Sequence, residues 1–225
     1  MPSSSTTVAH TADVDALPPI DGAAVRAGLA RCAQVVTRHA AALTRLDAVL
    51  GDGDHGDNLV IGFRAVNELL AEMPPDMPPG DLLRAVGHRL VAAVGGASGP
   101  LYGTACIEAG FVAGDRTSLD GPTLAAMFSA ASDGLARRGR CQPGDKTILD
   151  TLAPAAEAFG AAIEAGHEVD AAWRAACRAG ASGMRSTRDL VARRGLAMRL
   201  GDRSVGHRDP GAASCLLLLV ALGGR

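Results

Sequence analysis

The sequence predicts an all-helical domain built from closely packed helices. Hydrophobic residues make up 48% of the 225 residues but aromatic residues only 3%, so Ala, Leu and Val must form most of the core. Ala and Leu favour helices, and β-branched residues are not dominant. Apolar residues recur at mostly helical spacing, and no segment alternates apolar and polar residues as a half-buried strand does. The length suits one domain or at most two small ones.

The N-terminal half divides into a tail and a series of helices. Residues 1–20 are rich in Ser, Thr and Pro, and we expect them to form a disordered tail before a single domain over 21–225. Asp21 is a favourable N-cap for the first helix, which ends at Gly51, where an acidic loop begins. The same rules predict further helices at 58–73, 81–94, 101–113, 122–138 and 147–165.

The C-terminal part is less regular. Residues 170–193 predict one or two helices, interrupted near Gly180 to Gly183, because glycine weakens a helix. The last helix is expected at Ala212 to Leu222, with Asp209 as its N-cap and Pro210 in its first turn. The chain therefore predicts about eight helices.

Composition argues against several classes of protein. The formal net charge is −2 and the pI is about 6.3, so no large basic surface for nucleic acid or for an anionic membrane is expected. The five cysteines are far apart and never form a C-x-x-C pair, which favours small buried side chains over disulfides or a zinc site. The first residues, MPSSSTTVAH, do not resemble a signal peptide, and the longest apolar run is too short to span a bilayer. We expect a cytoplasmic protein.

Four loops between the predicted helices are rich in glycine and polar residues, at 51–58, 95–100, 139–147 and 201–211. If the helices run up and down around one core, several of these loops can gather at one end. The acidic stretch LDAVLGDGDHGDNL places Asp47 on the last turn of a helix and Asp52 and Asp54 just beyond it. Three oxygen ligands without cysteine suit Mg²⁺ or Ca²⁺ better than zinc.

Spacing alone leaves the acidic loop open to a second interpretation, a solvated turn in which Asp and Gly serve local backbone geometry. A calcium EF-hand loop is excluded, because counting from Asp52 places Gly56 at position 5 and Phe63 at position 12. His55 taken alone fits a surface residue best, and Asn58 is well placed to cap the second helix.

Two further loops have weak phosphate-binding signals. GGASGP offers small residues whose backbone N–H groups a phosphate can approach, although a plain helix connection explains it equally well. GRCQPGDKT imitates a Walker A loop, but Asp145 separates the glycine from the lysine and no strand precedes it. A P-loop is therefore rejected, and Lys146 and Thr147 remain helix-start residues near a ligand.

The motifs LDAVLGDGDHGDNL, GGASGPLYGT, GDKTILDTLAPA and GDRSVGHRDPGAAS occur in this order. Together they closely resemble the nucleotide-binding (L) subunit of dihydroxyacetone kinases, from about residue 25 to the C-terminus. The resemblance implies an eight-helix antiparallel barrel that binds ADP or ATP at one end, and two Mg²⁺ ions held by Asp47, Asp52 and Asp54. It implies a catalytic role for these aspartates and His55, and nucleotide contacts at His55, Asn58, Ala97, Ser98, Gly139, Ile148, Asp209 and Gly211.

The implied reaction is phosphoryl transfer to a small ketose, typically dihydroxyacetone, held by a separate K-type subunit. The phosphoryl donor is ATP, or a phosphotransfer-system phosphocarrier protein that rephosphorylates bound ADP. The chain departs from the family at GLAMRLGDR, where Leu196 replaces a nucleotide-contacting Arg and Met198-Arg199 replace Ser-Tyr; Arg194 or Arg199 is the candidate to compensate. The alternatives are a kinase for another ketose, such as erythrulose, and a non-catalytic nucleotide-sensing module that binds a regulator.

Overall fold

The computed structural model describes residues 19–224 and confirms the all-helical prediction. The described part of the chain contains eight α-helices, two 3₁₀ segments and two very short strands. The helices are α1 (Gly22–Leu50), α2 (His55–Glu72), α3 (Pro79–Ala93), α4 (Ser98–Ala113), α5 (Gly121–Gly139), α6 (Leu149–Glu164), α7 (Val169–Ser186) and α8 (Pro210–Gly223). The 3₁₀ segments are η1 (Thr187–Asp189) and η2 (Leu196–Ser204), and the strands are β1 (Ile20–Asp21) and β2 (Ser118–Leu119).

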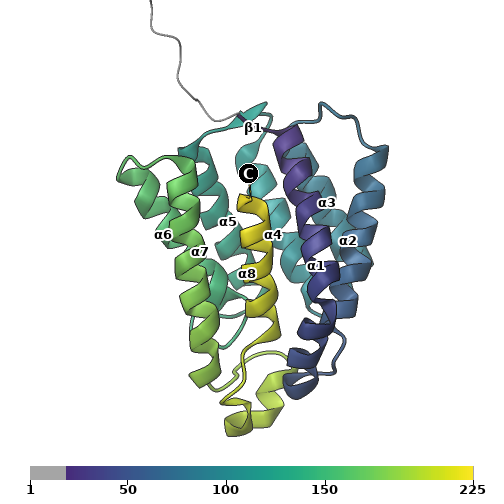
Figure 1. The fold of residues 1–225 in the computed structure, drawn as a ribbon, viewed down its shortest axis with the longest axis vertical. Helices are drawn as coiled ribbons and strands as arrows, with labels where there is room; N and C mark the ends of the chain where they lie inside the picture. Colours follow the sequence, from purple (N-terminus) through teal and green to yellow (C-terminus); the bar gives the residue numbers. More distant parts are fainter. Residues whose placement is uncertain (1–18, 225) are drawn as a thin grey trace, which may run out of the picture.

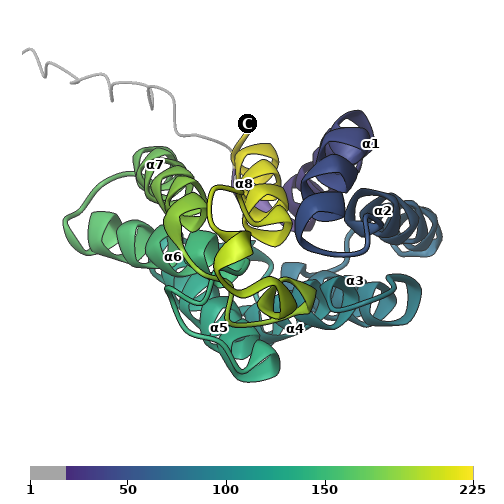
Figure 2. The same ribbon diagram turned by 90° about the horizontal axis from the view of Figure 1, so that it is seen from below.

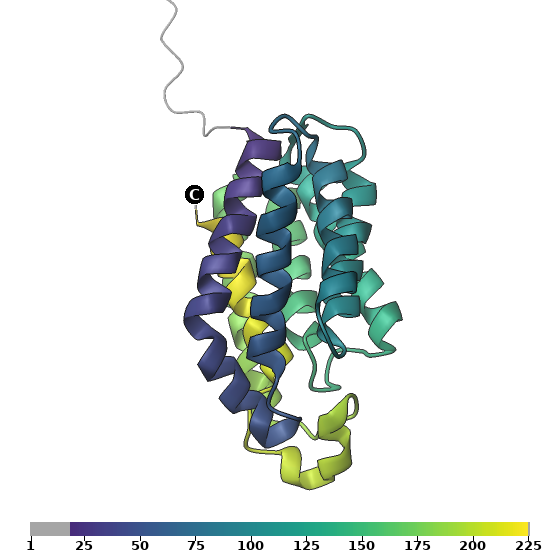
Figure 3. The ribbon, with the colours of Figure 1, turned by 90° about the vertical axis from the view of Figure 1, so that its right-hand side faces the viewer.

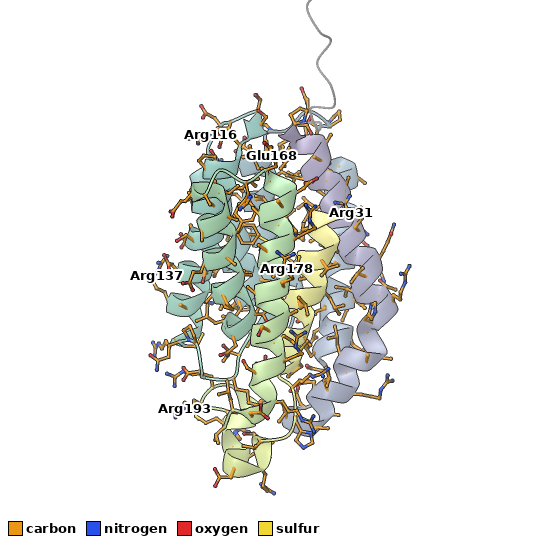
Figure 4. The ribbon with its side chains drawn as sticks, turned by 60° about the vertical axis from the view of Figure 1, so that its left-hand side comes forward. Arg31, Arg116, Arg137, Glu168, Arg178 and Arg193 are labelled. Atoms are coloured by element: carbon orange, nitrogen blue, oxygen red, sulfur yellow. The ribbon has the colours of Figure 1, made fainter. Side chains whose placement is uncertain are left out.

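The helices run alternately up and down and form a closed ring (Figures 1 and 2). Each helix packs on the next along the chain, and α8 returns to pack on α1. Arg31 of α1 supports this closure, because its guanidinium donates hydrogen bonds to the Ala221 and Leu222 carbonyls at the end of α8, at 2.8 and 3.0 Å (Figure 4). The apolar faces of the helices meet inside the ring, where Val36, Val66, Val86, Leu135 and Phe159 are fully buried. Among the described helices, none is long and apolar enough to cross a membrane.

The alternating direction of the helices brings the four glycine-rich loops to one end of the barrel, as the sequence predicts. The connections α1–α2, α3–α4, α5–α6 and α7–α8 all lie at the lower end in Figure 3, whereas β1 and β2 lie at the other end. The α7–α8 connection is the longest of them and contains η1 and η2, so it projects below the barrel (Figure 3).

Several predicted helix boundaries differ from the structure, such as that of α4, which begins at Ser98 rather than at residue 101, and two of the differences have identifiable reasons. The helix α2 begins at His55 rather than at residue 58, so Asn58 does not cap it; instead the Asn58 N–H donates to the Asp54 carbonyl at 2.9 Å. The helix α7 is continuous through Gly180 to Gly183 and ends at Ser186. Gly183 is a packing residue there, because a Cβ atom would overlap the Asp150 carbonyl oxygen on α6.

The strands were not expected, because two residues are too few to show alternation. Ile20 pairs with Leu119 and Asp21 with Ser118 in an antiparallel ladder that ties the start of α1 to the α4–α5 connection. The predicted tail, 1–20, lies outside the described residues except for its last two positions. Asp21 is the N-cap of α1 as predicted, with its carboxylate accepting from the Ala24 N–H at 2.9 Å.

Candidate functional site

A cavity of about 750 Å³ opens at the loop end of the barrel, and all four glycine-rich loops contribute to its wall. This volume falls in the range of small-molecule binding sites. The cavity brings together every residue that the resemblance assigned to the site: Asp47, Asp52, Asp54, His55, Asn58, Ala97, Ser98, Gly139, Ile148, Asp209 and Gly211.

Three carboxylates converge on one side of this cavity. Oxygen atoms of Asp47, Asp52 and Asp54 all lie within 4.8 Å of one another, with Asp47 buried and the other two exposed. No sulfur or imidazole ligand belongs to this cluster, so it fits a hard divalent cation such as Mg²⁺. A single ion can reach all three side chains from one position.

Asp47 also shapes the loop that carries the other two aspartates. Its Oδ2 atom accepts hydrogen bonds from the backbone N–H groups of Gly53, Asp54 and His55, at 3.0, 3.0 and 3.2 Å. Gly53 adopts a φ of +75°, which glycine tolerates and which lets the loop fold back over Asp47. The accepted N–H groups lie at the start of α2, where the helix dipole favours a negative charge. The cluster is thus held in place by the protein itself.

His55 is buried, with 8% of its surface exposed, so the surface interpretation of this residue is wrong. Its Nε2 atom lies 2.8 Å from Ser214 Oγ, and its Nδ1 atom lies 3.0 Å from Ser98 Oγ. Ser214 donates to the Gly211 carbonyl at 3.0 Å, and its hydroxyl lies 2.7 Å from the Tyr102 hydroxyl. Burial lowers the pKa of His55, although Asp47 and Asp54 partly oppose this shift.

The donors and acceptors of Ser214, His55 and Ser98 fix the direction of the hydrogen bonds between them. Ser214 has one proton and gives it to Gly211, so it accepts from His55 Nε2–H. A neutral His55 then accepts at Nδ1 from the Ser98 hydroxyl. Both ring nitrogens are therefore occupied, and His55 orients Ser98 instead of presenting a free nitrogen to the cavity.

The N-terminus of α4 supplies a second binding feature. Ala97 is its N-cap and Ser98 its first residue, and no side chain caps this end. Pro100 has no N–H, and the Leu101 N–H already donates to the Ala97 carbonyl at 3.1 Å. The N–H groups at the start of a helix attract anions, so this end of α4 can hold a phosphate close to the three carboxylates.

The opposite wall combines the start of α8 with the α5–α6 connection. Asp209 caps α8, with Oδ2 accepting from the Ala212 N–H at 2.7 Å, and burial raises the pKa of Asp209 to about 7. Gly211 lies against Ile148, so a Cβ at position 211 would be in contact with the isoleucine Cβ at 3.4 Å. Ile148 is largely buried and lines the cavity, so this part of the wall is apolar.

The rim contains the residues at which the sequence departs from the pattern that the resemblance implies. Leu196 and Met198 of η2 line the cavity with 40% and 54% of their surfaces exposed. Arg138, Arg194 and Arg199 lie on the same rim. Tyr102 and Ser214 belong to the site but were not predicted, although both lie inside motifs that carry the resemblance, GGASGPLYGT and GDRSVGHRDPGAAS.

Comparison with known proteins identifies the family. A model of the DAK2 domain matches residues 49–223. The chain belongs to the DAK2 domain family. It is 40% identical over 194 residues to the ADP-binding subunit DhaL of the PEP-dependent dihydroxyacetone kinase of Escherichia coli (strain K12), covering 86% of this chain and 92% of that protein. The resemblance inferred from the motifs is therefore confirmed.

Some relatives are much longer than this chain. The D-erythrulose kinase of Mycolicibacterium smegmatis is 39% identical over 176 residues, which cover 78% of this chain and 30% of that protein. The crystal structure of the C. freundii dihydroxyacetone kinase in complex with AMP-PNP and Mg²⁺ matches with a TM-score of 0.68 at 23% identity. The match covers 99% of this chain and 37% of that one, and it supports the fold.

Proposed function

We propose that this chain is the nucleotide-binding subunit of a Mg²⁺-dependent ketose kinase that acts on dihydroxyacetone. The carrying observation is the cluster of Asp47, Asp52 and Asp54, which shares one cavity with the uncapped N-terminus of α4. An all-oxygen donor set suits Mg²⁺, and a helix N-terminus suits a phosphate. The 40% identity to an ADP-binding subunit of a dihydroxyacetone kinase supports the same assignment.

The three aspartates would hold two Mg²⁺ ions against the phosphates of ADP or ATP. Bound Mg²⁺ supplies positive charge that offsets the negative charge developing on the phosphoryl oxygens. Without a cation, Asp47, Asp52 and Asp54 would repel a polyphosphate, so nucleotide binding should require the metal.

The protein groups around the metal cluster bind and orient the nucleotide, which is the main contribution of a protein to phosphoryl transfer. His55 acts by positioning Ser98 and does not need to touch the reacting atoms. Asn58, Ala97 and Ser98 would hold the phosphates, and Gly139, Ile148, Asp209 and Gly211 would hold the nucleoside end. Leu196 and Met198 offer an apolar rim where the resemblance implies polar side chains, and Arg194, which is paired with Asp145, or Arg199 is the candidate to supply positive charge.

The ketose is held by a separate K-type subunit, and the chain transfers phosphoryl groups only in its presence. Relatives of similar length are named PEP-dependent, which favours an ADP that stays bound and is rephosphorylated by a phosphotransfer-system phosphocarrier protein. The 39% identity to a D-erythrulose kinase makes erythrulose the second candidate substrate. Because ADP, ATP and phosphoenolpyruvate are cytoplasmic metabolites, we keep the cytoplasm as the proposed location.

A reconstituted assay tests this function. The purified chain is mixed with its K-type subunit and supplied either with ATP or with phosphoenolpyruvate and phosphotransfer proteins, and phosphorylation of dihydroxyacetone and of erythrulose is measured. Asp54→Asn should abolish transfer, whereas Asp57→Asn should not, because Asp57 is an exposed residue of the same loop outside the cluster. Retained Mg·ADP binding without transfer in any combination would favour the nucleotide-sensing alternative. Absence of Mg·ADP binding would overturn the proposal.

A further inference from the structure

Lys146 is the only lysine in a chain whose Lys and Arg together number 22. It is almost fully buried, with 1% of its surface exposed, although lysine is rarely buried without a partner. Its Nζ atom donates to three backbone carbonyls, those of Thr187, Leu190 and His207, at 2.6, 3.2 and 2.5 Å. An ammonium group has three N–H donors, so this side chain has none left for a phosphate.

The three carbonyls belong to the irregular connection between α7 and α8. Thr187 and Leu190 lie at the start of the segment 187–207, and His207 lies at its end. Between these points the chain carries the rim residues Leu196 and Met198. Lys146 thus holds both ends of the segment that forms one wall of the nucleotide cavity.

Besides Lys146, a few polar contacts attach this segment to the barrel, including an ion pair between Arg194 and the buried Asp145 carboxylate at 3.4 Å and a hydrogen bond from the Asp209 N–H to Thr187 Oγ1 at 3.0 Å. The Arg193 N–H donates to the Asp145 carbonyl at 3.1 Å, and the segment projects below the helices near Arg193 (Figure 4). Within the segment, the Gly206 N–H donates to the Arg188 carbonyl at 2.7 Å. Ala192 and Ala197 bury their side chains in a small cluster with Leu50, separate from the main core. A segment with so little buried apolar surface opens easily unless polar contacts hold it.

The chemistry of the side chain explains why a lysine stands here. A compact ammonium directs its protons to three carbonyls around one point, whereas a planar guanidinium directs its donors into one plane. Burial lowers the pKa of Lys146, and three nearby acidic groups, Asp209, Asp189 and Asp150, oppose this shift and favour the charged form. Lys146 also adopts a φ of +61°, a left-handed conformation that costs energy for a residue with a side chain. Such strain persists where surrounding contacts demand it.

We propose that Lys146 is a positioning residue that pins the segment 187–207 to the α5–α6 connection and thereby holds the rim of the nucleotide cavity in its binding geometry. This inference rests on the proposed nucleotide site, but the pinning of the segment is independent of it. Lys146 lines the cavity, but its three donors are all occupied by the segment, so it controls nucleotide affinity without donating to the nucleotide.

The principal test compares Lys146→Met with Arg26→Met. Arg26 is a matched control, because its guanidinium also donates to three backbone carbonyls, those of Leu70, Met73 and Pro74, at the opposite end of the barrel. Lys146→Met should weaken Mg·ADP binding, measured by titration calorimetry, by about tenfold or more. Arg26→Met should lower the melting temperature and leave this affinity within about twofold, because it affects general stability alone.

Hydrogen exchange separates the pin from the nucleotide site. In nucleotide-free protein, Lys146→Met should increase amide exchange over 187–207 and leave α1 to α6 unchanged. If amide exchange in 187–207 stays as in the wild type, Lys146 does not hold this segment in place, whether or not the protein binds nucleotide. If amide exchange in 187–207 rises in Lys146→Met but the wild type does not bind Mg·ADP, the proposed function fails, whereas the role of Lys146 in holding the segment is supported. If a folded Lys146→Met protein binds Mg·ADP with unchanged affinity, the claim that Lys146 controls nucleotide affinity is refuted.

Ser204→Ala keeps the test decisive if Lys146→Met does not fold. Ser204 is fully buried; it accepts from the Ala192 N–H at 2.9 Å and donates to the Gly201 carbonyl at 2.7 Å. Its loss should loosen the same segment, increase the reaction of Lys146 with an amine-specific acetylating reagent and weaken Mg·ADP binding. Because the chain has one lysine, intact mass together with a peptide map reports this single site. Increased acetylation with unchanged affinity would refute the coupling.

Discussion

Asp47 should be needed for the stability of the metal-free protein as well as for metal binding, which distinguishes it from Asp52. We consider Asp47→Ala in protein freed of metal and nucleotide. The substitution removes the acceptor of the Gly53, Asp54 and His55 N–H groups. Asp52 is exposed, so Asp52→Ala should change the free energy of unfolding by less than about 0.5 kcal/mol.

The contacts of Asp47 set the size of the effect. A hydrogen bond to a charged group contributes about 1.5–3 kcal/mol, but the N–H groups of Gly53 and Asp54 lie near the surface and can bind water instead. The hydrogen bond of the His55 N–H is buried, so this group loses its acceptor without replacement. We therefore expect Asp47→Ala to lower the free energy of unfolding by about 2–4 kcal/mol. In a chain of 225 residues this corresponds to a fall in melting temperature of about 5–15 °C.

Urea denaturation in EDTA measures the free energy of unfolding of both variants, and titration calorimetry measures their binding of Mg·ADP. Both variants should lose binding, because each lacks one carboxylate of the cluster. Only Asp47→Ala should lose stability. Equal unfolding free energies for the two metal-free variants would refute the assignment of Asp47 as the residue that shapes the loop.

Three further predictions concern ligand, pH and packing. Saturation with Mg·ADP at about one hundred times the dissociation constant should stabilise the protein by about 2.7 kcal/mol, or about 5–10 °C by differential scanning fluorimetry, and EDTA should abolish the shift. Burial raises the pKa of Asp209 from 3.8 to about 7, so between these values the folded state keeps a proton that the unfolded state has released. The contribution of Asp209 to stability then falls as pH rises through this window, and Asp209→Asn should flatten that fall in urea denaturation at pH 5 and pH 8. Gly183→Ala should destabilise the protein by about 1–3 kcal/mol, because its Cβ would meet the α6 backbone, whereas Gly160→Ala, with open space around it, should stabilise α6 by about 0.5–1 kcal/mol in thermal denaturation.

The sequence predicted the helices and the end of the barrel that holds the site, because both follow from local rules. Apolar spacing marks each helix, and short connections force neighbouring helices to alternate in direction. Loops with glycine at every second connection must then meet at one end. The position of Asp47, Asp52 and Asp54 in one cluster follows from their closeness in sequence, so a single motif was enough to suggest a cation site.

Contacts between distant residues account for what the sequence did not predict. The helix α2 begins at His55, inside the predicted loop, where the His55 N–H donates to the Asp47 carboxylate. Gly183 was taken as a helix break, because its packing on Asp150 of α6 involves a residue 33 positions away. Lys146 was expected only as a helix-start residue near a ligand, and its contacts with the segment 187–207 could not be predicted, since its three partners are backbone carbonyls, which every residue possesses.

These distant contacts divide the proposed nucleotide site into two parts with different physical origins. The phosphate side rests on helix ends and on Asp47, whose hydrogen bonds lie within one loop and form as soon as α1 and α2 pack. The rim depends on the segment 187–207, whose two ends a buried ammonium joins to the α5–α6 connection, together with the contacts of Arg193 and Arg194 with Asp145. Leu196 and Met198 belong to the rim, where their exposed side chains line the cavity and do not pack in the core of the barrel. Changes in nucleotide affinity can therefore arise in the rim while the metal cluster and the fold stay as they are.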